Sequence, residues 1–157
     1  MFDNKNMRKF MKWKIYLSGE IHTNWRNELR LRASEAGLNV EFLGPETEHD
    51  LSDNFGANIL GSEDKKFWHD HKGAKINSIR IKRNIESADL VIVKFGDKYK
   101  QWNAAFDAGY SAAKGKSLII MHEDDNQHAL KEIDASALAV VKNNQQLIEI
   151  LKYVTKE

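Results

Sequence analysis

The chain lacks several features that would mark it for a particular role. It has no cysteine, which excludes disulfides, thiol chemistry and thiolate metal sites. Its 24 basic and 23 acidic residues leave a formal net charge of +1, so no excess of charge points to nucleic acid or to an anionic membrane. We therefore expect neither a nucleic-acid partner nor a membrane partner.

Long hydrophobic runs are also missing. No segment is apolar enough to cross a membrane and no signal peptide is recognisable, so we expect a cytoplasmic protein. Residues 1–10 (MFDNKNMRKF) are polar and basic without a period, which is typical of a frayed or disordered leader. Residues 11–157 are enough for one domain with a substantial core, and 41% hydrophobic residues is a globular value.

The chain does contain a regular alternation of apolar runs and helical segments. Five runs have the length of buried strands, namely residues 12–18, 39–43, 89–95, 117–121 and 137–141. Because helices separate them, they predict an α/β fold with a parallel sheet covered on both faces. Right-handed crossovers favour a flavodoxin-like three-layer sandwich, with a five-stranded parallel sheet in the order 2-1-3-4-5.

The segments between these runs differ in how clearly they show a helical period. Helices are predicted at residues 25–36, 74–87, 102–113 and 143–156. In the second of them, Ile76, Ile79 and Ile85 are the expected inward residues. Residues 46–73 are polar without a clear period, so we predict a long loop with room for one short helix. Residues 122–133 are also predicted to be irregular, apart from one turn of helix.

The helix predicted at residues 102–113 contains an unexpected acid. Its apolar residues recur at helical spacing and form a stripe, which consists of Trp102, Ala105, Phe106, Gly109, Ala112 and Ala113. Asp107 lies beside that stripe. In the predicted topology the chain reverses between strands 1 and 3, and the loops after these strands open a ligand-binding crevice. The position of Asp107 beside this crevice makes it a candidate site residue.

Three stretches resemble the nucleoside 2-deoxyribosyltransferase superfamily, which also contains deoxynucleoside monophosphate N-glycosidases. They are KIYLSG at residues 14–19, SADLVIV at 87–93 and AFDAGYSAAKGKSLII at 105–120. The run QWNAAFDAGY resembles the uncharacterised YtoQ family within it still more closely. The resemblance covers nearly all of residues 12–153. It implies a flavodoxin-like fold and cleavage or transfer of the N-glycosidic bond of a nucleoside or nucleotide.

The resemblance also implies a catalytic residue. The family's nucleophile is a glutamate in a helix with a Phe/Met-Glu-x-Gly-Tyr-like signature, and Asp107 stands at that position. Its carboxylate would attack C1′ of the sugar or stabilise its oxocarbenium-like charge. Aspartate is one methylene shorter, and catalytic placement is sensitive to shifts of about 1 Å, so substrate depth, reaction or activity can differ. The alternative is an acid that the helix dipole favours and that has no catalytic role.

Two further positions depart from the family pattern. An acid about six residues before the nucleophile is replaced by Gln101, and the small pair before the helix is replaced by Asn103-Ala104. Asn103 shares a helix face with Asp107, so the two would bind a sugar hydroxyl together. Alternatively, Asn103 is only the N-cap of the helix.

Cations also replace a family acid in the preceding helix. That acid falls near Ile81, and the neighbouring residues here are basic: Arg80, Lys82 and Arg83. A site that has exchanged carboxylates for cations suits a phosphorylated ligand, with Arg80 as its contact. The alternative is a basic helix face that is simply solvated.

The loop after the first strand, SGEIHT, supplies the remaining candidates. Gly19 permits close backbone approach next to Ser18, and free N–H groups of the following helix attract anions or sugar hydroxyls. Glu20 and His22 are candidates for orienting a sugar or moving a proton, although loop residues need no such role.

The run FWHDH at residues 67–71 contains two histidines, but no spacing announces a third ligand, so we predict no metal. Its two aromatic residues would cover a base by stacking or anchor the long loop. We expect no cofactor.

Together these features predict an enzyme, an N-glycosidase or N-(deoxy)ribosyltransferase, that binds a nucleotide, a nucleoside or a sugar phosphate. The alternatives are a catalytically inactive nucleotide or nucleotide-sugar binding module, and an interaction domain with an incidental crevice. Members of the resembled family are oligomers in which a neighbouring chain can complete the pocket. We therefore expect a homo-oligomer, a dimer or larger, that assembles through the helices around residues 74–113.

Overall fold

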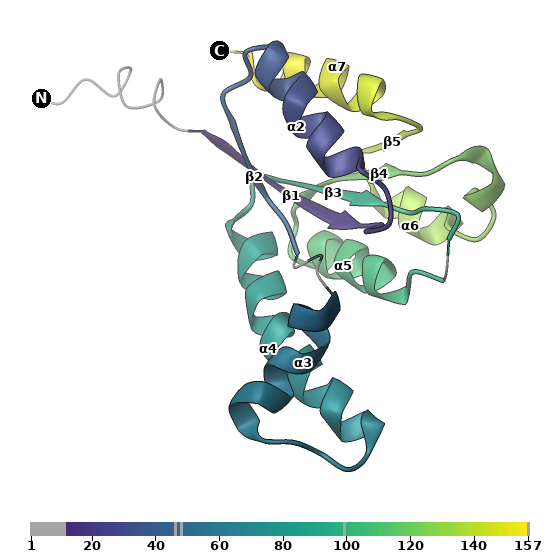
Figure 1. Cartoon of the computed structure of the whole chain (residues 1–157). Helices are drawn as coiled ribbons and strands as arrows, with labels where there is room; N and C mark the ends of the chain where they lie inside the picture. Colours follow the sequence, from purple (N-terminus) through teal and green to yellow (C-terminus); the bar gives the residue numbers. More distant parts are fainter. Residues whose placement is uncertain (1–11, 46, 48, 99, 157) are drawn as a thin grey trace, which may run out of the picture.

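The computed structural model describes residues 12–45, 47, 49–98 and 100–156, so the predicted leader at residues 1–10 lies outside the described part. A five-stranded sheet in the order β2-β1-β3-β4-β5 forms its centre, and all neighbouring strands are parallel. The strands are β1 (Trp13–Gly19), β2 (Val40–Leu43), β3 (Leu90–Lys94), β4 (Ser117–Met121) and β5 (Ala139–Val141). Helices lie on both faces of the sheet (Figure 1), which confirms the predicted α/β architecture and strand order.

Alternation along the strands divides the core into two layers. Ile15 and Leu17 of β1 pack under α2 (Trp25–Glu35) and α7 (Asn144–Val154). Tyr16 points to the opposite face, because successive side chains of a strand alternate between faces. That face is covered by α4 (Lys66–Ser87), α5 (Trp102–Ala113) and the short α6 (Lys131–Ser136), which follows the 3₁₀ turn η1 (Asp124–Asn126). Ser18 and Asp107, which are described below, lie on this second face.

A helical hairpin replaces the long loop predicted at residues 46–73. Helix α3 (His49–Leu60) packs against the first half of α4, and the pair projects away from the sheet (Figure 1). A Cβ atom at Gly56 would lie 2.4 Å from the backbone nitrogen of Gly73, so glycine is required where the two helices touch. The loop prediction was wrong because this hairpin does not pack on the sheet and therefore has no clear apolar stripe.

In helix α4, one of the residues that were predicted to face inward is exposed. Ile85 is fully buried as predicted, but Ile79 is 70% exposed. Among the described residues, no helix is both long enough and apolar enough to span a membrane.

Helix α5 has the predicted bounds but an unexpected orientation. Its buried residues are Ala104, Asp107, Ala108 and Ser111. The two largest members of the predicted apolar stripe, Trp102 and Phe106, are 72% and 57% exposed. Small side chains on the inward face let the helix approach the sheet closely, which leaves the large ones outside. Asp107 therefore belongs to the buried face of the helix.

Candidate active site

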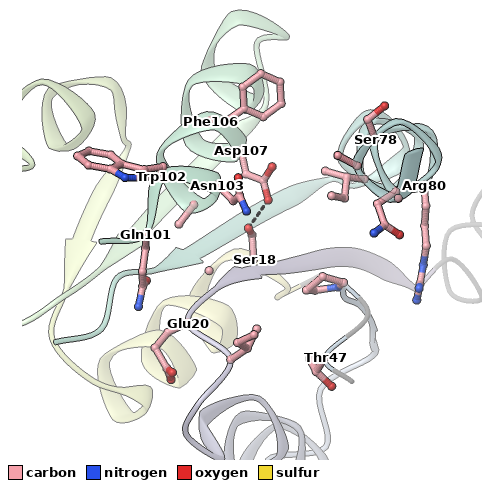
Figure 2. A pocket seen from close by; sticks show the side chains of 18 of the residues that line it. Ser18, Glu20, Thr47, Ser78, Arg80, Gln101, Trp102, Asn103, Phe106 and Asp107 are labelled. Carbon is pink, nitrogen blue, oxygen red and sulfur yellow. Dashed lines mark hydrogen bonds between the residues drawn. The ribbon is translucent and has the colours of Figure 1, made fainter. Parts of the chain in front are cut away.

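A cavity of about 860 Å³ opens at the carboxyl ends of β1 and β3, between α4 and α5. Its lining comes from the loop after β1, the segment after β2, the middle of α4, and the start of α5 with the loop before it (Figure 2). This place is the topological switch point of the sheet, where ligands of open α/β folds bind. The volume lies within the range of about 300–1,000 Å³ that is usual for small-molecule sites.

Asp107 and Ser18 meet in this cavity. The Ser18 hydroxyl donates a hydrogen bond of 2.5 Å to Oδ2 of Asp107, and the two residues are only 1% and 6% exposed (Figure 2). Within the described residues, no hydrogen bond reaches the other carboxylate oxygen, Oδ1. The carboxylate of Asp107 thus has one oxygen held by Ser18, while the other oxygen can accept a hydrogen bond from a ligand.

The surroundings of Asp107 change its acidity. Burial raises its pKa to about 6, while the hydrogen bond from Ser18 acts in the opposite direction. At neutral pH the group is still mostly ionised, but its charge is poorly solvated. Carboxylates of this kind are concentrated in functional sites, although buried structural acids share the property.

Tyr16 lies behind the cavity lining, close enough to feel the charge of Asp107, and the sequence analysis missed it. Its side chain is fully buried and lies on the same face of β1 as Ser18, two positions away. Its hydroxyl is buried and has no hydrogen-bond partner among the described residues. Burial, followed by the negative charge of Asp107, raises the pKa of this phenol, so it keeps its proton. The alternation along β1, which places Tyr16 with Ser18, was the available signal.

Arg26, also missed, fixes the end of β1. Its buried guanidinium donates to three backbone carbonyl oxygens: those of Leu17 at 3.2 Å, Gly19 at 3.0 Å and Glu20 at 2.6 Å. These carbonyls bracket Ser18, so Arg26 positions the strand end that carries its hydroxyl. No sequence signal announces this role, because arginine in a helix normally extends into solvent.

The glycine of the β1 loop is required by geometry. Gly19 has a φ of +95°, and a Cβ atom there would lie 2.0 Å from the carbonyl oxygen of Lys94. The ends of β1 and β3 can approach this closely only without a side chain at position 19.

Glu20 organises its own loop. Its buried carboxylate accepts hydrogen bonds from the backbone N–H groups of His22 and Thr23 and from the Thr23 hydroxyl. Burial opposes ionisation, but these hydrogen bonds and the charge of Lys94 outweigh it and lower the pKa of Glu20. The side chain of His22 is more accessible to a ligand than the buried carboxylate of Glu20, since His22 lines the cavity and is exposed.

Gln101 and Asn103 sit at the start of α5. The side-chain oxygen of Gln101 accepts from the Gly96 N–H at 3.2 Å, and its nitrogen donates to the Lys98 carbonyl at 3.3 Å. Gln101 is also the N-cap residue of α5, so the alternative that Asn103 caps the helix was wrong. Asn103 lies in the first turn and is exposed.

The structure places every predicted site residue in the lining of this one cavity. These residues are Ser18, Gly19, Glu20, His22, Arg80, Gln101, Asn103 and Asp107. The sequence analysis missed polar lining residues on the α4 side, which are Thr47, Asn77 and Ser78. They follow or belong to the segment whose helices were not foreseen.

The FWHDH segment lies at the start of α4, and of its residues Asp70 alone is part of the cavity lining. Phe67 stacks on His71 with ring centroids 5.8 Å apart, and both Phe67 and Trp68 are exposed. Among the described residues, no group of three or more His, Cys, Asp or Glu side chains is placed to hold a metal ion.

The sheet order defines a flavodoxin-like α/β protein, and the cavity lies at its switch point. Residues 16–155 match the family model described as "Nucleoside 2-deoxyribosyltransferase YtoQ", and the chain belongs to this family. A curated relative is the uncharacterized protein YtoQ of Bacillus subtilis (strain 168). It is 42% identical over 144 residues, which cover 92% of this chain and 97% of the relative.

Two solved structures are similar in fold. A conserved protein from Enterococcus faecalis V583 superposes with a TM-score of 0.62 at 14% identity, covering 92% of this chain and 99% of the other. The Clostridium botulinum CMP N-glycosidase BcmB gives a TM-score of 0.48 at 14% identity, covering 90% and 98%. At this identity the first similarity concerns the fold alone.

Proposed function

We propose that the protein binds a nucleotide or a related N-glycoside and cleaves or transfers its N-glycosidic bond, with Asp107 as the nucleophile. The observation that carries this proposal is the placement of one carboxylate. Asp107 is buried at the switch-point cavity, with Oδ2 held by Ser18 and Oδ1 without a partner among the described residues. Membership of a family named for nucleoside 2-deoxyribosyltransferases supports the same chemistry.

The proposed reaction has two steps. Oδ1 of Asp107 attacks C1′ while the bond from C1′ to the base nitrogen breaks, and the base leaves with the bonding electrons and takes up a proton. A glycosyl ester of Asp107 results. Water, or a second base, then attacks C1′ and releases the carboxylate, so that one difficult displacement is divided into two. We assign the proton transfer to His22, which has an exposed side chain at the cavity.

The charges around the cavity support a phosphorylated ligand. Four cationic side chains contribute to the lining, and these are Arg80, Lys82, Lys98 and Lys100. Glu20, one of the acids in the lining, is engaged by its own loop. A nucleotide therefore fits this surface better than an uncharged nucleoside, and Arg80 is the assigned phosphate contact.

The alternative is a catalytically inactive nucleotide-binding module. Asp107 is only 6% exposed and one of its oxygens is already bound, so a sugar must come close to reach it. The shorter acid makes this approach more demanding than a glutamate would.

The deciding experiment incubates the purified protein with ribo- and deoxyribonucleoside monophosphates and measures free base by chromatography. We expect base release by the wild type and none by Asp107→Asn, whose ligand-induced thermal shift is retained because asparagine keeps the shape of the side chain. Asp107→Glu tests the fit of the pocket, and we expect it to lose binding. If the wild type shows thermal shifts but releases no base from any nucleotide, the protein is a binding module and the proposed enzymatic function is wrong.

We also propose that the protein is a homo-oligomer that assembles through α4 and α5. The exposed faces of these helices carry Ile79 and Phe106, each more than half exposed. Gly109 follows on α5, with no atom within 4 Å of a Cβ built there, so a second helix has room to approach. Apolar surface of this kind is typical of protein–protein contacts. A cytoplasmic location stays a prediction from the sequence.

A further inference from the structure

The cationic side chains of the cavity fall into two groups on opposite walls. Arg80 and Lys82 belong to α4, whereas Lys98 and Lys100 belong to the loop between β3 and α5. Figure 2 shows Asp107 between the two walls, with Arg80 on one side and Gln101, the neighbour of Lys100, on the other. The proposed function assigns an individual ligand contact only to Arg80 of the α4 group.

The second group stands on a loop that is built around Gln101. The two hydrogen bonds of the Gln101 side chain, to Gly96 and to Lys98, turn the glutamine into the loop and leave Lys98 and Lys100 exposed. The ammonium nitrogen of Lys100 lies 5.9 Å from the centre of the Trp102 ring, and Trp102 also lines the cavity. Cations beside an exposed aromatic face can bind an anionic group that is attached to a flat ring.

The acids of the cavity do not neutralise this second group. Glu20 accepts hydrogen bonds from its own loop, Asp107 accepts from Ser18, and Asp70 pairs with Lys66 at 3.2 Å. In the described part of the chain, no salt bridge involves either Lys98 or Lys100. Among the described residues, the loop therefore presents to the cavity two cations that form no ion pair with a protein carboxylate.

We propose that Lys98, Lys100 and Trp102 form a second subsite, which binds a phosphate attached to an aromatic ring system. This inference rests on the proposed nucleotide at the Arg80 wall and extends it across the cavity. The volume of about 860 Å³ lies toward the upper end of the usual range for small-molecule sites, which is room for a second ring. The ring system belongs either to the distal half of a dinucleotide or to a separate second mononucleotide.

The test compares adenosine monophosphate with diadenosine diphosphate, in which two such halves share a diphosphate. Calorimetry on the Asp107→Asn protein, where the proposed chemistry is blocked, measures both affinities and the number of ligands bound. We expect the dinucleotide to bind about tenfold more tightly, as one charge-assisted contact provides. The Lys98→Gln/Lys100→Gln double variant removes this advantage. If instead two mononucleotides bind per chain and the double variant loses one of them, the ring belongs to a separate second nucleotide.

The matched control is Lys131→Gln/Lys152→Gln, which makes the same charge change at two lysines outside the cavity lining and should keep the advantage. One mononucleotide per chain with no preference for the dinucleotide overturns the second subsite, and so does a preference that survives in the double variant. Absence of binding by both probes overturns it as well. Failure of the proposed reaction is seen separately, as absence of base release by the wild type, and leaves these affinities unchanged.

Discussion

Ser18 donates a 2.5 Å hydrogen bond to Asp107 across 89 positions of sequence, from the end of β1 to the second turn of α5. The contact exists because β1 and β3 are neighbours in the sheet and α5 follows β3 directly. It holds Oδ2 in place and opposes the rise in the pKa of Asp107 that burial causes. The same bond therefore sets both the orientation and the charge of the proposed nucleophile.

Removing the Ser18 hydroxyl should change the pH dependence of base release. Ser18→Ala takes away the hydrogen bond that lowers the pKa of Asp107, so the midpoint of the pH–rate profile should move upward from about 6. We expect the rate at pH 6 to fall about tenfold, as for one hydrogen bond to a charged group, and to recover partly at pH 8. Ser111→Ala is the matched control, because its buried hydroxyl donates to the backbone oxygen of Asp107 at 2.7 Å. A profile shifted equally by both variants would count against the assigned role.

Asp107→Asn should stabilise the protein at alkaline pH. The folded protein holds a proton on Asp107 up to about pH 6, whereas an ordinary aspartate releases it near 3.8. The folded state therefore binds more protons in this window, and the free energy of unfolding falls as pH rises through it. Asparagine does not titrate, so the variant does not lose stability in this way. The free energy of unfolding of the variant minus that of the wild type should therefore be about 3 kcal/mol larger at pH 8 than at pH 3. Urea unfolding at both pH values measures it, and a pH-independent difference would refute the shifted pKa.

Arg26→Gln should destabilise the fold more than an ordinary helix substitution. It leaves the carbonyl oxygens of Leu17, Gly19 and Glu20 without their buried donor. We expect a loss of about 2–3 kcal/mol, together with lower turnover, because the strand end that carries Ser18 loosens. Arg30→Gln, at an exposed position of the same helix, should change stability by less than about 0.5 kcal/mol. Equal losses of unfolding free energy in the two variants, measured by urea unfolding, would contradict the role of Arg26 in holding the end of β1.

Phe106→Glu should dissociate the proposed oligomer. The ring is 57% exposed on the outer face of α5, and burying a carboxylate there against a second copy is costly. Light scattering at micromolar concentration should show the wild type as a dimer or larger and the variant as a monomer. Leu138→Glu places the same charge at a leucine that is 77% exposed, away from α4 and α5, and should leave the mass unchanged. A monomeric wild type would end this proposal.

Arg80→Ala tests the phosphate contact on α4. We expect nucleotides to bind the wild type more tightly than the matching nucleosides, and salt to weaken this preference. The variant should bind both classes alike. Arg83→Ala is the control, because this neighbouring cation of α4 is not part of the cavity lining. Equal binding of both classes by the wild type would remove the reason for assigning Arg80 this role.

The sequence was informative where side-chain pattern alone determines structure. The five apolar runs predicted the strands, and their order followed from the handedness of the crossovers. Asp107 was singled out because it lies beside the apolar stripe of the helix after the third strand, next to the predicted crevice. The predicted site residues meet in one cavity for the same reason, since the loops after β1 and β3 open at one sheet edge.

The sequence was misleading where packing distance determines which residues face inward. Trp102 and Phe106 were expected in the apolar stripe of α5, yet Ala104 and Ala108 face the sheet because the helix lies close to it. The α3–α4 hairpin was missed because α3 rests on another helix and not on the sheet. The role of Arg26 depends on three backbone carbonyls, and no pattern of side chains encodes such contacts.

Helix α4 connects the core of the domain to the projecting helical hairpin. At 22 residues it is about 33 Å long, and its second half packs on the core while its first half carries α3. Asn77 and Ser78 of the cavity wall sit near its middle. The hairpin therefore extends from the core through α4 alone, with α3 attached to the half of α4 that lies farther from the core. Because α4 is one continuous helix, a displacement of α3 would move the cavity wall that carries Asn77 and Ser78.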